Sequence, residues 1–261
     1  MMQEILNNYS NYVNNLNKLS QVYHYNLLSN KDALDYCIKR NISLDMIKKF
    51  YLGFDSFNLV NDDFFKVNQL SSSFFIKNGF FSKDGNNYYS KLYDRLIFPV
   101  FDVKGNVIAF SGRYMDNKIP KYWTNSNNDV FQKSLTFYGL YQSLPMITST
   151  KAVLIVEGNI DVISCYQAKI KNVVAAFGTS FTYNHFLLLR AFANTFVFCF
   201  DNDKAGKKAE EKVLEFSKTI DDVTVKFLNL EDSHDPDEFL NKHFNNGKIL
   251  KEVFEDLAGL L

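Results

Sequence analysis

The chain has 261 residues, of which 46% are hydrophobic and 22% are charged, so extensive disorder is disfavoured and a packed core is expected. Its formal net charge is zero, which argues against a protein that coats nucleic acid through bulk charge. The balance hides an uneven distribution, because residues 1–150 hold 16 Lys and Arg against 12 Asp and Glu, whereas the rest hold 13 against 17.

The first half of the chain predicts helices followed by an antiparallel hairpin. Apolar residues follow helical spacing through residues 1–52, where Ser43 is the expected N-cap of a helix that Gly53 ends. Residues 96–101 and 107–110 are apolar runs separated by a turn that contains glycine. A mixed α+β arrangement follows for this half.

The second half changes to alternating strands and helices. Short apolar runs are each followed by a helical segment, and this alternation predicts a parallel sheet covered on both faces. The expected strands are residues 152–156, 173–176, 195–200 and 223–228, and the expected helices are residues 159–168, 182–191 and 204–218. The predicted fold class is α/β, with an α+β amino-terminal subdomain at 1–147, a parallel-sheet subdomain at 148–232, and an acidic motif with a short helical tail at 233–261.

Acidic residues follow the predicted strands at the edge where parallel sheets bind ligands. Glu157 follows the first strand, Asp201 and Asp203 follow the third, and Asp235 and Asp237 follow the fourth. Taken alone, each acid could be solvated or cap a helix. Close carboxylates repel one another unless a hard cation lies among them, so two or more Mg²⁺ or Mn²⁺ ions are expected.

Glycines beside these strand ends would let the backbone approach a ligand closely. Gly158 follows the first strand, and Gly206 lies shortly after the third. Gly178-Thr179 follows the second strand, where exposed N–H groups could face a phosphate. Turn glycines are common, so each of these positions is weak evidence alone.

The three cysteines and the chain's hydropathy argue against a zinc-binding, a secreted or a membrane-spanning protein. Cys37, Cys165 and Cys199 are far apart and show no zinc-ligand spacing, so no zinc site and reduced thiols are expected. No apolar stretch has the length of a signal peptide core or a membrane span. The sequence therefore predicts a cytoplasmic protein with no membrane partner.

Several segments resemble a known family. Residues 153–161 (VLIVEGNID), 198–206 (FCFDNDKAG) and 234–240 (HDPDEFL) resemble the Toprim domain of DnaG-type bacterial DNA primases. In the front half, residues 95–113 (RLIFPVFDVKGNVIAFSGR) and 137–141 (FYGLY) resemble the amino-terminal subdomain of the primase polymerase core. The likeness covers roughly residues 20 to 245.

The resemblance implies roles for individual residues. Glu157, Asp201 and Asp203 would be metal ligands, with Asp161, Asp235 and Asp237 as supporting acids. The residues implied to line a basic groove for template and nucleotide are Arg95, Arg113, Lys121 and Lys133, with Tyr122 available to stack on a base. Each could instead be an ordinary surface or core residue, and core packing is favoured for Tyr138 and Tyr141.

The sequence departs from the family pattern at three places. Asn202 stands where the family usually has Gly and Asn159 stands where it has an aromatic residue, and both changes leave the carboxylates intact. Residues 131–134 (FQKS) are less basic than the family segment, which puts the strength of nucleotide binding in doubt.

The implied activity is template-directed synthesis of short RNA primers on single-stranded DNA from ribonucleoside triphosphates. The resemblance also implies a primosome and a replicative helicase, which would bind through segments outside this chain. Toprim domains occur in nucleases and topoisomerases as well, so a DNA-breaking enzyme is one alternative. A non-catalytic module that binds single strands is another.

Overall fold

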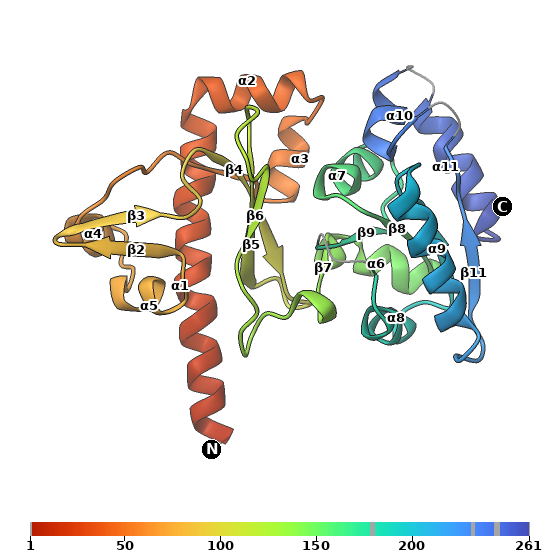
Figure 1. Cartoon of the computed structure of the whole chain (residues 1–261), viewed down its shortest axis with the longest axis horizontal. Coiled ribbons are helices and arrows are strands. Elements are labelled where there is room, and N and C mark those ends of the chain that lie inside the picture. The colour runs from red at the N-terminus through yellow and green to blue at the C-terminus, as the bar shows by residue number, and fades with distance from the viewer. Residues whose placement is uncertain (1, 178–180, 231–232, 243–245, 261) are drawn as a thin grey trace. The chain divides into compact units, whose positions relative to one another are not determined.

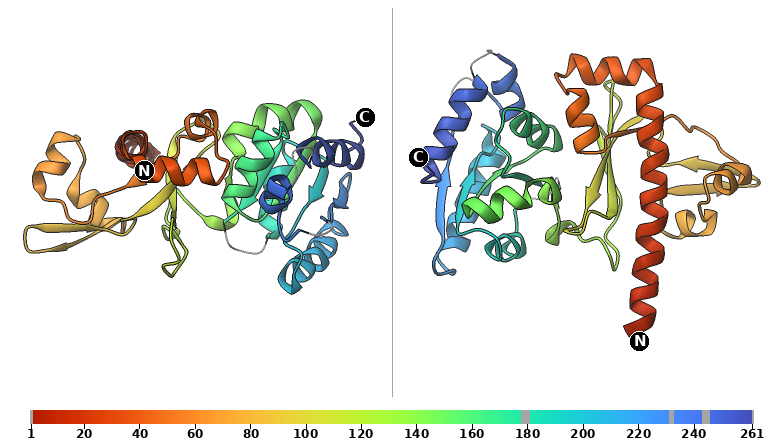
Figure 2. Two further views of the ribbon diagram at one scale, coloured as in Figure 1. Left: turned by 90° about the horizontal axis from the view of Figure 1, so that it is seen from above. Right: turned by 180° about the vertical axis from the view of Figure 1, so that it is seen from behind.

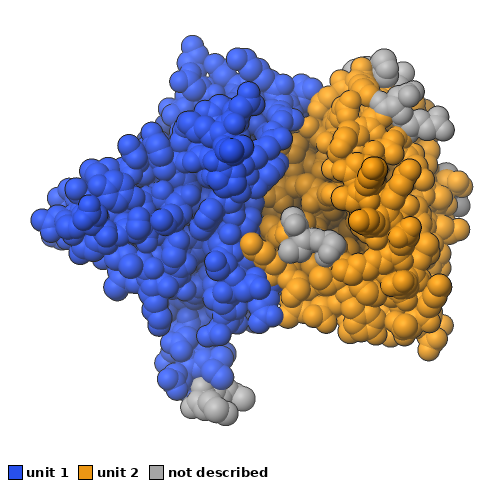
Figure 3. Space-filling model, in the orientation of Figure 1, with its two compact units in different colours: residues 1–132 blue, residues 133–261 orange. Residues whose placement is uncertain are grey.

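A computed structural model describes residues 2–177, 181–230, 233–242 and 246–260 of the chain (Figure 1). The chain divides into two compact units, Met1–Gln132 (unit 1) and Lys133–Leu261 (unit 2), which Figure 3 colours separately. The sequence placed its first boundary at residue 147. The structural division comes earlier because residues 137–150 pack against a strand of unit 2.

Unit 1 is built on a long helix, α1 (Met2–Ser29), which packs against strands β1 and β5 of a sheet with the order β1-β4-β5-β6 (Figures 1 and 2). The expected hairpin is confirmed as β4 and β5, which pair antiparallel. The other elements of unit 1 are α2 (Lys31–Lys39), α3 (Leu44–Lys49), β1 (Gly53–Asp55), α4 (Asp62–Val67), α5 (Ser72–Lys77), β2 (Phe81–Asp84), β3 (Asn87–Ser90), β4 (Arg95–Phe101), β5 (Val107–Tyr114) and β6 (Tyr122–Thr124).

The two ends of helix α3 test the expectations for Ser43 and Gly53. Ser43 is the N-cap, because its hydroxyl accepts a hydrogen bond from the Met46 N–H, as expected. The helix ends at Lys49, however, and Gly53 begins strand β1 instead of ending the helix. Glycine is needed there for another reason, since a Cβ atom would lie 2.6 Å from the Tyr23 Cβ on α1.

Asp55 at the end of β1 is a fully buried carboxyl group in unit 1. It accepts a hydrogen bond from the Phe57 N–H at 2.9 Å and another from the Ser90 hydroxyl. Burial raises its pKa to about 6. The folded state therefore binds a proton at Asp55 more tightly than the unfolded state does. Protonated Asp55 adds to the free energy of unfolding below the unfolded pKa, and this contribution is lost as pH rises to about 6.

We expect Asp55→Asn to remove this pH dependence. The free energy of unfolding of the native protein, minus that of the variant, should fall by about 2 kcal/mol between pH 4 and pH 7, since one pKa unit corresponds to about 1.4 kcal/mol and part of the change lies below pH 4. Urea denaturation at several pH values, followed through Trp123 fluorescence, measures the difference. A difference that stays constant across this range would contradict the assignment.

Unit 2 contains a five-stranded sheet with the order β11-β10-β8-β9-β7. Strands β8 to β11 pair in parallel, which confirms the prediction, and β7 pairs antiparallel with β9 at the edge. The elements are η1 (Lys133–Leu135), β7 (Phe137–Tyr138), α6 (Leu140–Thr150), β8 (Ala152–Val156), α7 (Asn159–Gln167), β9 (Val173–Ala176), α8 (Tyr183–Arg190), β10 (Thr195–Phe198), α9 (Lys204–Ser217), β11 (Thr224–Phe227), α10 (Pro236–Lys242) and α11 (Asn246–Leu257).

The core of unit 2 explains why its apolar runs form central strands. Alternate residues of β8 and β10, such as Val153, Ile155 and Phe196, pack with Phe186 of α8 and Val213 of α9 in one buried cluster. Tyr138 is buried as expected. The prediction that Tyr141 is buried was wrong, because its side chain on α6 is 43% exposed.

Within the described ranges, no helix combines the length and the apolar character needed to cross a bilayer.

Candidate metal centre

The parallel sheet of unit 2 brings Glu157 and Asp201 together. β8 and β10 are adjacent parallel strands with Ile155 opposite Phe198, so the residues that follow them leave the sheet at the same edge. There, Glu157 Oε1 accepts a hydrogen bond of 3.0 Å from the Asp201 N–H. The structure therefore places these two predicted site residues in direct contact.

The electrostatics around Asp201 are those of crowded negative charges. Its pKa is raised to about 6, first by burial and then by the charge of Glu157, with smaller contributions from Asp235 and Asp203. His234 opposes this shift, since its Nδ1 lies 3.5 Å from Asp201 Oδ2. A bound cation would relieve the same repulsion.

Asp203 has a defined second role as the N-cap of helix α9. Its Oδ1 accepts hydrogen bonds from the N–H groups of Ala205 at 2.7 Å and Gly206 at 2.9 Å. These two bonds lower its pKa and keep it ionised. The capping role considered for strand-end acids is thus present here, in a residue whose side chain is still exposed.

Gly206 is required for the close approach of α9 to the strand end. A Cβ atom at this position would lie 2.1 Å from the Asp201 carbonyl oxygen, a distance that the backbone cannot accommodate without moving. The glycine noted in the sequence therefore sets where the helix begins relative to Asp201.

Asp161 is a buried carboxyl group that joins two helices. It is 6% exposed, and its two oxygens accept hydrogen bonds from the Gly158 N–H at 2.9 Å and the Asp237 N–H at 3.1 Å. Burial is the main cause that raises its pKa well above the usual range, followed by the charge of Asp235. Asp161 thereby ties the start of α7 to the start of α10.

The remaining acids are also held by hydrogen bonds. Asp235 Oδ1 accepts from the Glu238 N–H at 2.7 Å in the first turn of α10. Asp237 is buried, and its Oδ1 accepts from the Ser164 hydroxyl at 2.6 Å. Sequence reasoning missed Ser164, which follows Asp161 by three residues and so shares a face of α7 with it.

The donor chemistry of this edge fits a hard divalent cation. The predicted ligands are carboxylates, and the charge of Glu157 adds to the effect of burial in raising the pKa of Asp201. Among the described residues, no three acidic, histidine or cysteine side chains already converge on one point. Gly178 and Thr179, considered as phosphate contacts, lie outside the described residues.

Arg95, a predicted groove residue, has a structural role in unit 1. It is 3% exposed, and its guanidinium donates to the backbone carbonyl oxygens of Lys121 and Pro120, each at 3.0 Å, and of Gly112 at 3.3 Å. It also lies 3.5 Å from the centre of the Tyr114 ring. Arg95 therefore fixes the segment that carries Lys121.

Arg113 and Tyr122 lie close together on the neighbouring strands β5 and β6. Arg113 is buried, donates to the Tyr36 hydroxyl and lies 5.7 Å from the centre of the Tyr122 ring. Tyr122 is 41% exposed, so its ring is partly accessible. Lys133 belongs to unit 2, in η1. Contact of these residues with a template stays a prediction.

We expect Arg95→Met to destabilise unit 1 by about 3 kcal/mol, because the carbonyl oxygens of Gly112, Pro120 and Lys121 lose a charged donor. The variant keeps the apolar part of the side chain, so the loss reports on the guanidinium. Urea denaturation followed through Trp123 measures it. Lys104→Met, at an exposed position on the β4–β5 turn, is the matched control and should change stability by less than about 0.5 kcal/mol.

Two known families match the chain in sequence. The DNA primase catalytic core, N-terminal domain, matches residues 22–144, and a Toprim-like domain matches residues 154–240. The DNA primase of Borreliella burgdorferi is 37% identical over 228 residues, which is 85% of this chain and 43% of that protein. The chain thus spans less than half the length of this relative.

Solved structures agree with the sequence matches. The Escherichia coli primase catalytic core is 30% identical, with a TM-score of 0.78 over 91% of this chain and 77% of that one. A DnaG primase catalytic domain bound to single-stranded DNA is 28% identical, with a TM-score of 0.79 over 96% and 81% of the two chains. From these matches, the chain belongs to the DnaG-type DNA primase family and comprises the two catalytic-core domains of that family.

Proposed function

We propose that this chain synthesises short RNA primers on single-stranded DNA from ribonucleoside triphosphates. The observation that carries the proposal is the contact between Glu157 and Asp201 at adjacent strand ends, in a chain whose front half matches the primase core. In this reaction the 3′-hydroxyl of one ribonucleotide attacks the α-phosphate of the next, and pyrophosphate leaves. The enzyme contributes mainly by positioning and by electrostatic stabilisation.

Glu157, Asp201 and Asp203 are the proposed ligands of Mg²⁺ or Mn²⁺. Bound divalent ions would promote ionisation of the attacking hydroxyl and neutralise the charge that develops on pyrophosphate. Asp161 and Asp237 support these ligands by holding the starts of α7 and α10, and Asp235 caps α10. Glu157 orients the Asp201 backbone through its hydrogen bond.

Lys121 and Tyr122 are proposed to contact the template strand. Arg95 holds their segment through its hydrogen bonds to Lys121 and Pro120, and Arg113 lies against the Tyr122 ring. A lysine supplies charge for phosphate, and an exposed aromatic ring can stack on an unpaired base. Lys133 is proposed to contact the nucleotide triphosphate. A similar primase domain is bound to single-stranded DNA, which supports this choice of template.

The test is primer synthesis by the purified chain. It is incubated with a single-stranded template, labelled ribonucleoside triphosphates, and either Mg²⁺ or Mn²⁺. Template-dependent RNA products that disappear with a chelator are expected. Labelled DNA that is cut instead would favour a Toprim nuclease, and nucleotide binding that no metal affects would favour a non-catalytic module.

A cytoplasmic location and a replicative helicase partner accompany this proposal. Both are proposed from the replication role of primases. The DNA-breaking alternative is weaker, because the front half of the chain matches the N-terminal domain of the DNA primase catalytic core.

A further inference from the structure

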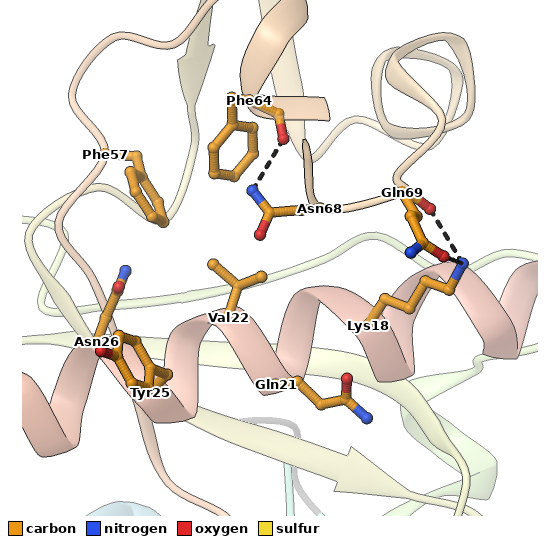
Figure 4. Close-up of a pocket in the computed structure, with 9 residues that line it drawn as sticks. All are labelled: Lys18, Gln21, Val22, Tyr25, Asn26, Phe57, Phe64, Asn68 and Gln69. Carbon is orange, nitrogen blue, oxygen red and sulfur yellow. Dashed lines mark hydrogen bonds between the residues drawn. The ribbon is translucent and has the colours of Figure 1, made fainter. Parts of the chain in front are cut away.

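A pocket of about 450 Å³ lies within unit 1, between helix α1 on one side and helix α4 with its flanking segments on the other (Figure 4). Lys18, Gln21 and Tyr25 lie along one side of α1 at spacings of three and four residues, so they share a face of the helix. The metal-site carboxylates all belong to unit 2 and do not line it. Its volume falls within the range of small-molecule sites and suits a nucleotide.

Aromatic rings form two parts of the pocket wall. Phe57 and Phe64 pack against each other with ring centres 4.7 Å apart, and this pair forms one part of the pocket wall. Tyr25 is 72% exposed and, within the described chain, its side chain has neither a ring partner nor a hydrogen bond. An exposed tyrosine in a pocket offers an open face on which a planar ring can stack.

Side-chain amides supply the polar part of the lining. The Asn68 amide donates to the Phe64 carbonyl oxygen at 2.8 Å, and the Asn26 amide donates to the Ser56 hydroxyl at 3.2 Å. In each case an N–H is used and the amide oxygen remains as an acceptor. The Gln21 side chain has no hydrogen bond to any described residue. Amides of this kind match the donor and acceptor edges of nucleobases.

Lys18 is the charged residue of the pocket lining, which among the described residues contains no carboxylate. Its Nζ donates to the Gln69 carbonyl oxygen at 3.2 Å and to the Gln69 Oε1 at 3.4 Å, as Figure 4 shows. These bonds hold the ammonium group at the pocket edge. Its positive charge is therefore placed where a phosphate beside a bound base could reach it.

We propose that this pocket binds one unpaired nucleobase together with its adjacent phosphate. The base stacks on Tyr25, the amides of Gln21, Asn26 and Asn68 recognise its edge, and Lys18 faces the phosphate. A purely apolar ligand would leave these amides without partners, which costs binding energy. The choice of single-stranded DNA as the source of the base rests on the proposed function; a free nucleotide carries the same chemistry.

Photo-crosslinking tests the pocket directly. The full chain is irradiated with a short oligodeoxynucleotide that carries 5-iododeoxyuridine, and adducts are located by peptide mass spectrometry. We expect an adduct at Tyr25 or Phe57. Competition with unlabelled oligonucleotide and with thymidine monophosphate distinguishes the sources, because a strand site is protected at a lower concentration of oligonucleotide than of mononucleotide.

Matched variants separate stacking from other effects. Tyr25→Ala should weaken oligonucleotide binding about tenfold, and Tyr25→Phe should restore it, because base stacking requires the ring. Lys18→Gln should reduce the salt dependence of binding by about 0.7 in the slope of log affinity against log salt, as expected for one phosphate contact on a single strand. Circular dichroism verifies that each variant is folded.

Two results would overturn the proposal: adducts confined to residues outside the pocket, or equal affinity of Tyr25→Ala and the native chain. Neither depends on primer synthesis. Asp201→Asn should keep the adduct while losing primer synthesis. A failure of the proposal for the pocket can therefore be distinguished from a failure of the proposed catalytic function.

Discussion

Primer synthesis is expected to fall about 1,000-fold in Asp201→Asn and in Glu157→Gln, because each change removes a proposed metal ligand. Metal ions contribute several kcal/mol to transition-state stabilisation, and each 1.4 kcal/mol corresponds to about tenfold in rate. The assay measures labelled RNA formed on a single-stranded template. Asp221→Asn, an exposed acid before β11, is the matched control and should keep native activity.

The stability of the metal-free protein separates a lost ligand from a damaged fold. Burial and the charge of Glu157 disfavour the ionised form of Asp201, as its raised pKa indicates. Asp201→Asn removes that charge, so its Tm without metal should equal or exceed that of the native chain. Added Mn²⁺ should raise the Tm of the native chain more than that of the variant. Near-native synthesis by both variants would reject the assignment of these ligands.

The second large effect is expected at Asp161. Asp161→Ala leaves the partly buried N–H of Gly158 and the buried N–H of Asp237 without an acceptor. An unsatisfied buried donor costs about 1–3 kcal/mol, and the removal of a disfavoured charge offsets part of the total, so we expect a net loss of about 3 kcal/mol. Primer synthesis should also fall, because α7 and α10 lose the link that positions the acids at their starts.

Amide hydrogen exchange of the Asp161 variants localises the effect. Exchange at Gly158 and Asp237 should become faster in Asp161→Ala, while the amides of unit 1 stay unchanged. Asp161→Asn keeps one acceptor oxygen and should lose about half as much stability. If Asp161→Ala were as stable as the native chain, the two hydrogen bonds would not hold these helices together.

Much of unit 2 was predictable because its local sequence and its fold agree. The apolar runs of β8, β9 and β10 are too short for buried helices, and each is followed by a helical segment, so a parallel sheet was the expected outcome. The positions of Glu157 and Asp201 followed from the sheet alone, since adjacent parallel strands end at the same edge.

Other contacts depend on long-range packing that local patterns do not encode. Asp161 meets the Asp237 N–H across 76 residues, and no spacing rule connects them. Burial of Arg95 was also unexpected, because arginine is rarely buried unless its charge is paired. The hairpin register gave one usable signal, since it places Arg95 opposite Tyr114, against which the guanidinium packs.

The antiparallel strand β7 has a practical consequence for fragments of this protein. β7 occupies the edge of the sheet beside β9, and its two residues precede helix α6 in the chain. A fragment that begins at residue 148 would lose this strand and leave backbone N–H and C=O groups of the apolar strand Val173–Ala176 open to pairing with another molecule. Self-association of such a fragment would then reflect an uncovered edge and not a natural oligomer.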